Sequence, residues 1–176
     1  YSTLSQAYTI AVQENGTPEN WNINNSITGP ENILNILLKN ADVRKNCGRY
    51  SRCIPDKYYQ LFGSTTPNDY DNAIWVSKAQ LADGTLIYTS LYGITNCGYS
   101  DGSTLSLQNI CALIDIDING FQKPNRVGID NFSFWLTKYG IIPIGSTQES
   151  GYSFGAQCNN KTASSGMGCT AWVLYN

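Results

Sequence analysis

A short run of oxygen-bearing residues, Asp115-Ile-Asp117-Ile-Asn119-Gly120, is the segment of this 176-residue chain best suited to metal chemistry. Calcium takes about six to eight oxygen ligands, and alternate side chains ahead of a turn-forming glycine can converge on one ion. A calcium loop of the EF-hand type needs glutamate at its twelfth position, which is Arg126 here. We therefore predict a calcium site of another kind, closed by Asn125 and Asp130.

The same residues also fit a structure without a metal. Asp115 and Asp117 can form the polar side of a half-buried strand, because successive side chains of a strand point to opposite faces. Asn119-Gly120 is then an ordinary turn, and Asp130 hydrogen-bonds within a loop. The sequence leaves both interpretations open.

Six cysteines lie outside any CxxC pair, in a chain that has no histidine. Both features disfavour zinc and favour disulfides. Spacing does not decide the pairing, but bridging neighbours is the simplest arrangement: Cys47–Cys53, Cys97–Cys111 and Cys158–Cys169. Three disulfides imply the periplasm, the cell surface or the medium.

Catalytic patterns are scarce. Without histidine, the usual serine–histidine and cysteine–histidine pairs cannot form. The G-x-S-x-G pattern at residues 151–155 lacks a base and the strand–turn–helix context of a nucleophile elbow. With a formal net charge of −2, the chain is also poorly suited to bind a phosphate backbone. We expect neither an enzyme nor a nucleic-acid-binding protein.

Two helices are expected ahead of any sheet. The first covers residues 1–15, where Leu4, Tyr8 and Ala11 recur at helical spacing and Gly16 provides a stop. The second covers residues 28–40, with Thr28 and Glu31 as a capping box. Ile33, Leu34, Leu37 and Leu38 make its apolar face.

Strand patterns dominate after residue 73. Residues 73–76 and 85–88 flank an Asp83-Gly84 turn, which is a strong hairpin signal. Further strands are predicted at 111–118, 132–136, 141–144 and 171–175, with 141–144 at an edge because it contains proline. The predicted fold is α+β: one domain over residues 1–176, in which two helices pack on a four- to five-stranded antiparallel sheet formed within residues 73–176.

Several segments together resemble bacterial type IV pilin-like proteins and pseudopilins. Tyr-Ser-Thr-Leu-Ser-Gln-Ala-Tyr at 1–8, followed by 14–18 and Trp21, resembles the stretch that follows their hydrophobic stem. Leu-Ala-Asp-Gly-Thr-Leu-Ile at 81–87 resembles their hairpin. Ile-Asp-Ile-Asn-Gly at 116–120, with the Pro124-to-Phe134 segment, and Gly-Cys-Thr-Ala-Trp-Val at 168–173 are similar to their later segments.

The resemblance implies a precursor whose leader is cleaved and whose apolar N-terminal helix anchors the subunit in the inner membrane before packing inside a filament. Residues 1–16 would be the C-terminal half of that stem helix, so Tyr1 would continue an apolar rod. Cys158–Cys169 would resemble the C-terminal disulfide loop of pilins. In some relatives a calcium ion steadies a loop near the end of the sheet, which draws attention to Asp117, Asn119 and Asp130.

The function expected from this resemblance is that of a structural subunit in an extracellular or periplasmic filament, either a pilin or a pseudopilin of a type II-like secretion system. Its partners would be copies of itself or related pilins. The alternative is a secreted, calcium-dependent binding module for glycans or surface adhesion. The tryptophans Trp21, Trp75, Trp135 and Trp172 could stack on sugars, although most aromatic residues are expected in the core or an interface.

Overall fold

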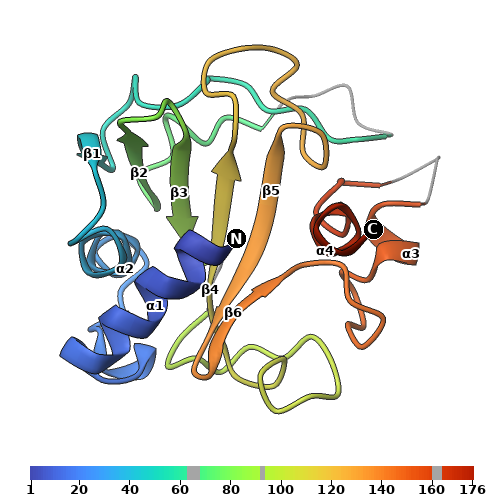
Figure 1. Cartoon of the computed structure of the whole chain (residues 1–176), viewed down its shortest axis with the longest axis horizontal. Coiled ribbons are helices and arrows are strands. Elements are labelled where there is room, and N and C mark those ends of the chain that lie inside the picture. The colour runs from blue at the N-terminus through green and yellow to red at the C-terminus, as the bar shows by residue number, and fades with distance from the viewer. Residues whose placement is uncertain (63–67, 92–93, 160–163) are drawn as a thin grey trace.

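A six-stranded antiparallel sheet forms the centre of the protein, with strands in the order β1-β2-β3-β4-β5-β6. The computed structural model describes residues 1–62, 68–91, 94–159 and 164–176. Each strand pairs with the next one along the chain, so the sheet is a meander (Figure 1). The strands are Val43–Gly48 (β1), Val76–Leu81 (β2), Leu86–Ser90 (β3), Ile110–Asp117 (β4), Asn131–Thr137 (β5) and Gly140–Pro143 (β6).

Two helices cover one face of this sheet, α1 (Ser2–Asn15) and α2 (Gly29–Leu37), joined through a 3₁₀ turn, η1 (Pro18–Asn20). Figure 1 shows α1 lying across the strands, with α2 beside it. The largest core lies here, because Ile114, Phe134 and Leu136 point from the sheet toward Leu4, Ala11 and the apolar side of α2. None of the described helices is long and apolar enough to cross a membrane.

The second face of the sheet carries no long helix among the described residues. The segment between β1 and β2 and the segment after β6 cover it instead, the latter including two short helices, α3 (Phe154–Gln157) and α4 (Cys169–Tyr175). Two smaller apolar clusters form beneath them, one around Tyr58 and Tyr88 and the other around Trp135 and Ile144. The second face is therefore buried under loops rather than exposed to solvent.

The prediction of four or five strands is wrong, because the sheet has six. The sequence pattern missed β1, whose residues Arg44, Lys45 and Asn46 are exposed. An edge strand needs no buried face to form, so it lacks the apolar alternation on which the prediction relied. Backbone pairing with β2 holds β1 in place.

The predicted last strand, residues 171–175, is also wrong, because it lies within helix α4. Trp-Val-Leu-Tyr favours a strand by local preference. Here the Cys158–Cys169 disulfide fixes the start of the segment, and the Ala171 amide donates to the Ile144 carbonyl at 2.9 Å. Tertiary contacts thus override the local preference.

Of the other local predictions, some are confirmed, but the strand predicted at 73–76 begins only at Val76 and runs to Leu81. Helix α1 ends at Gly16, whose φ is 73°, and the Asp83-Gly84 turn joins β2 to β3. Strand β6 lies at an edge of the sheet, as its proline indicated. The predicted capping box is wrong: Thr28 is the N-cap but makes no side-chain cap bond. Asn25 Oδ1 instead accepts bonds from the amides of Ile27 and Thr28 just ahead of α2.

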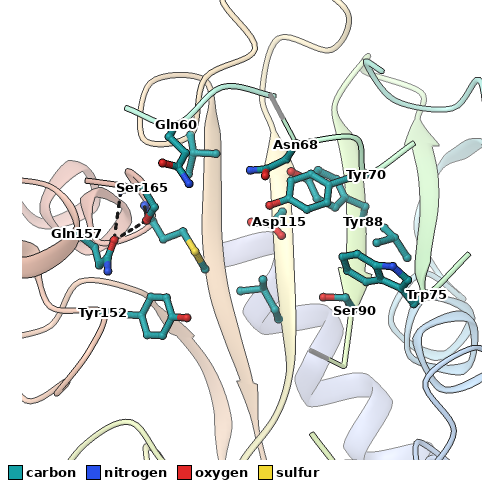
Figure 2. Close-up of a pocket in the computed structure, with 14 residues that line it drawn as sticks. Gln60, Asn68, Tyr70, Trp75, Tyr88, Ser90, Asp115, Tyr152, Gln157 and Ser165 are labelled. Atoms are coloured by element: carbon teal, nitrogen blue, oxygen red, sulfur yellow. Dashed lines mark hydrogen bonds between the residues drawn. The ribbon is translucent and has the colours of Figure 1, made fainter. Parts of the chain in front are cut away.

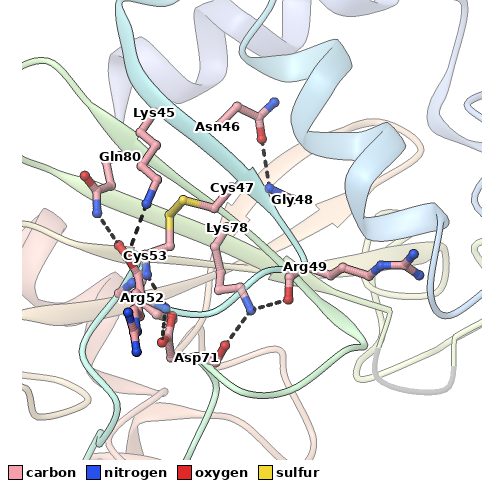
Figure 3. The surroundings of a disulfide bond; sticks show 11 residues. Lys45, Asn46, Cys47, Gly48, Arg49, Arg52, Cys53, Asp71, Lys78 and Gln80 are labelled. Atoms are coloured by element: carbon pink, nitrogen blue, oxygen red, sulfur yellow. Dashed lines mark hydrogen bonds between the residues drawn. A yellow bond between two sulfur atoms is a disulfide. The ribbon is translucent and has the colours of Figure 1, made fainter.

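Three disulfides staple the fold, and they join the neighbouring cysteines that the sequence favoured: Cys47–Cys53, Cys97–Cys111 and Cys158–Cys169. Figure 3 shows how the first bridge ties β1 to the segment that covers the second face. Near it, Asp71 accepts hydrogen bonds from the amides of Cys53 and Ile54. Lys78, fully buried on β2, donates to the Asp71 carbonyl at 2.8 Å.

Candidate functional site

The predicted metal ligands do not all lie together: Asp115 lies on β4 itself, whereas the others lie at or near the turn that follows β4. Asp115 and Asp117 both point to the second face of the sheet, and both are buried, with 7% and 0% of their surface exposed. Asp115 accepts a hydrogen bond from Ser133 Oγ at 2.5 Å, across the β4–β5 pair. Asp117 accepts one from the buried Tyr58 hydroxyl at 2.8 Å. The structure therefore does not bring Asp115 to the turn that follows.

Asp117, Asn119 and Asp130 do meet at this turn. The Asn119 amide lies between the two carboxylates, with its nitrogen 3.4 Å from Asp130 Oδ2. In the opposite amide orientation, the Asn119 nitrogen donates to Asp117 Oδ1 at 2.9 Å and to the Gln122 carbonyl at 3.2 Å. Three of the predicted ligands thus lie together.

Asp130 also organises the loop ahead of β5. Its carboxylate accepts hydrogen bonds from the amides of Asn125, at 2.8 Å, and Arg126, at 2.6 Å. Asn125 Oδ1 is buried and has no hydrogen-bond partner among the described residues. The Arg126 guanidinium turns away and donates to the carbonyls of Gln60 and Leu61, so it does not neutralise Asp130.

Burial dominates the electrostatics of both β4 carboxyls. It raises the pKa of Asp115 to about 7, against the opposing effect of the Ser133 hydrogen bond. It raises the pKa of Asp117 to about 6, where hydrogen bonds from Tyr58 and the Asn119 amide act in the opposite direction. Both carboxyls therefore hold protons more tightly than exposed ones.

Some of the oxygen ligands that calcium requires are present at this turn. Asp117, Asn119 and Asp130 supply hard oxygen atoms from two segments, and the unpartnered Asn125 Oδ1 adds a fourth candidate. Within the described ranges no group of three or more His, Cys, Asp or Glu side chains is arranged to hold a metal ion. Any calcium here would depend on amide and backbone oxygens as much as on carboxylates.

A cavity of about 310 Å³ opens over β3 and β4 on the second face, beside Asp115. Tyr70 and Trp75 approach from one side, and Tyr152, Gln157 and Ser165 approach from the C-terminal segments on the other (Figure 2). No local sequence pattern indicates this cavity, because its lining comes from five separate segments. Of the four tryptophans, Trp75 lines it, Trp21 and Trp135 are buried in the cores, and Trp172 is 51% exposed.

A second feature that sequence analysis missed is an apolar surface on α4 and the start of α1. Its members are large, adjacent in the chain or in space, and 39–66% exposed: Tyr1, Trp172, Val173, Leu174 and Tyr175. The pKa of the Tyr175 hydroxyl is raised by burial and then by interaction with Tyr1, which joins the two elements. We call these five residues the α4 surface.

Beside the α4 surface runs an apolar groove of about 460 Å³, lined by Ile142 and Pro143 of β6, Phe154 of α3, and Trp172 of α4. The groove and the α4 surface together form a broad apolar area at the β6 edge. No protein-family model, curated protein or solved structure matches this chain.

Proposed function

We propose that this chain is the globular part of a filament subunit similar to type IV pilins or pseudopilins, which acts by assembly rather than by catalysis. The observation that carries the proposal is the α4 surface. Five large side chains are 39–66% exposed there, next to an apolar groove. Monomeric soluble proteins rarely expose a contiguous apolar patch of this kind, and such patches mark interaction sites.

The occupant proposed for this surface is a second copy of the chain or a related subunit. Aromatic residues are enriched at the centres of protein interfaces, and three of the five members are tyrosine or tryptophan. The groove beside Trp172 would accept apolar side chains of the neighbour. In the proposed assembly the α4 surface meets a different face of the next copy, and such heterologous contacts build open filaments when the rotation between copies does not close a ring.

Helix α1 is firmly attached to the sheet, as a filament subunit requires. Leu4 and Ala11 are buried against the strands. The Tyr8 hydroxyl donates to the Lys138 carbonyl at 2.8 Å, and the Tyr1 hydroxyl donates to the Ile141 carbonyl at 3.1 Å. A force applied along α1 would therefore be transmitted to β5 and β6.

The three disulfides indicate an oxidising environment, extracellular or periplasmic. This location fits a subunit that assembles outside the cytoplasm. Covalent bridges at β1, β4 and α4 would keep the domain folded outside the cytoplasm.

The proposal includes a calcium ion at the turn after β4. Asp117, Asn119 and Asp130 would hold it, with Asn125 Oδ1 as a further ligand. The convergence of the Asp117 and Asp130 carboxylates on the Asn119 side chain supports this site. Calcium would fix the loop ahead of β5 and would take no part in a reaction.

The reading frame ahead of Tyr1 in the gene tests the filament proposal against a secreted module. A filament subunit requires an apolar helix of about 20 residues or more that runs into α1. A secreted module requires instead a cleavable signal peptide with a short apolar core of about 7–15 residues. The second result would overturn the proposal.

A further inference from the structure

The geometry points to a binding site for a neutral saccharide unit in the cavity over β3 and β4, where Tyr70, Trp75 and Asp115 meet. This site lies on the second face of the sheet, away from the α4 surface, and it does not rest on the filament proposal. Its volume of about 310 Å³ lies at the small end of the range of ligand pockets, about 300–1,000 Å³, and suits a ligand of about one sugar ring.

The floor of the cavity follows from strand register. On the second face, Tyr88 of β3 lies opposite Asp115 of β4, and Ser90 lies opposite Leu113. These four neighbours give the floor one ring, one carboxylate, one hydroxyl and one apolar side chain. Because they belong to two paired central strands, the floor is preformed and rigid.

Aromatic rings supply the wall on one side. Tyr70 packs on Tyr88 with their ring centres 5.5 Å apart, and Trp75 meets Tyr70 edge to face at 6.3 Å. Trp75 is 40% exposed, so part of its ring remains open to a ligand. Apolar faces of sugar rings stack on such surfaces, because aromatic rings offer a large area at low entropic cost.

Polar groups from the segment between β1 and β2 and from the segment after β6 complete the cavity. Gln60 and Asn68 line one end of the cavity (Figure 2). Gln157 lines the other side, where its Oε1 accepts a bond from Ser165 Oγ at 2.7 Å. Amides can both donate and accept, which matches the hydroxyl groups of a sugar.

The charge of the lining disfavours anionic ligands. No lysine or arginine is among the described residues that line the cavity, and Asp115 is the one acidic residue there. An anionic ligand would find no cationic side chain in this lining and would face the acidic Asp115, which is unfavourable. A quaternary ammonium would gain from the rings but would leave the amides unused. Hydrolysis of a bound sugar normally takes two carboxyl groups, so the arrangement supports binding.

Calorimetric titration of the disulfide-bonded protein tests this site. The probes are methyl glycosides of glucose, galactose, mannose and N-acetylglucosamine, with choline and inorganic phosphate for comparison. We expect at least one glycoside to bind. Trp75→Ala should weaken it about tenfold by removing the stacking surface. Trp172→Ala is the matched control, since Trp172 is also exposed but lies outside the cavity.

A second variant distinguishes a loss of binding from a loss of folding. Asn68→Ala removes one polar group at the rim, and we expect the affinity to fall while the thermal midpoint stays unchanged. Three results would overturn the inference: no glycoside binds, choline binds in place of every glycoside, or binding survives both Trp75→Ala and Asn68→Ala. None of these results bears on whether copies of the chain associate through the α4 surface.

Discussion

Glu149 accepts a hydrogen bond at 3.0 Å from the indole nitrogen of Trp135, and both side chains are buried beneath the second face of the sheet. The other carboxylate oxygen of Glu149 accepts the Gly145 amide at 2.6 Å. This one carboxyl thus joins β5 to the segment after β6. Burial nevertheless raises its pKa to about 7, with a smaller effect in the same direction from Asp101.

The raised pKa of Glu149 predicts that stability falls as pH rises. The folded protein retains a proton that the unfolded chain releases near pH 4, so this contribution is complete in acid and is lost as pH rises toward about 7. Asp115 and Asp117 act in the same direction. We expect the unfolding midpoint to decrease from about pH 5 to about pH 8.

Glu149→Gln isolates the contribution of this residue, because glutamine stays neutral at every pH. Its unfolding free energy should fall less steeply than that of the native protein, by about 1 kcal/mol per pH unit near pH 6. Chemical denaturation at several pH values measures both slopes. Equal slopes would show that Glu149 does not titrate in this range.

The three disulfides should contribute unequally to stability. Cys97 and Cys111 are buried in the helix-covered core and lie 14 residues apart, whereas Cys47 and Cys53 lie 6 residues apart. Chain entropy predicts losses of about 3 and about 2 kcal/mol when these bridges are removed. Replacing each pair by alanine and measuring urea unfolding checks the order. A larger loss for the 47–53 pair would contradict it.

Calcium that binds at the turn after β4 should raise the midpoint of thermal unfolding. A bound ion stabilises the folded state in proportion to ln(1 + [Ca²⁺]/Kd), so millimolar calcium and excess chelator should give different midpoints. Asp117→Asn should abolish this difference. Asp115→Asn is the matched control, since Asp115 lies on the same strand but hydrogen-bonds to Ser133.

An unchanged midpoint across millimolar calcium would count against the site. Loss of the calcium effect in Asp115→Asn as well as Asp117→Asn would show that Asp115 belongs to the ligand set after all. The calcium titration tests whether the ion binds, and the comparison of the two variants tests which aspartate binds it.

Local signals in the sequence were sufficient where the chain itself decides the conformation. Gly16 ends α1 because glycine adopts a positive φ without strain, and Asp83-Gly84 forms the hairpin for the same reason. The alternation on β4 correctly placed Asp115 and Asp117 on the same face of the strand. Neighbouring cysteines pair as their short spacing favoured.

Sequence patterns failed where contacts between distant segments determine the local structure. Strand β1 depends on pairing with β2, and α4 depends on the Cys158–Cys169 bridge and on Ile144. The aspartate face of β4 was expected to be the polar side of a strand, yet loops bury it. The cavity combines residues from five segments, so no local window could have revealed it.

Assembly through the α4 surface can be tested by photo-crosslinking in the cells that make the protein. Tyr175, 66% exposed on the α4 surface, is replaced by benzoyl-phenylalanine, and Tyr50, 74% exposed beyond β1, is replaced in the same way as a control. If copies associate through the α4 surface, position 175 should give a ladder of crosslinked products at multiples of the subunit mass, and position 50 much weaker products. Monomer alone at position 175, in protein that is folded and exported, would contradict it.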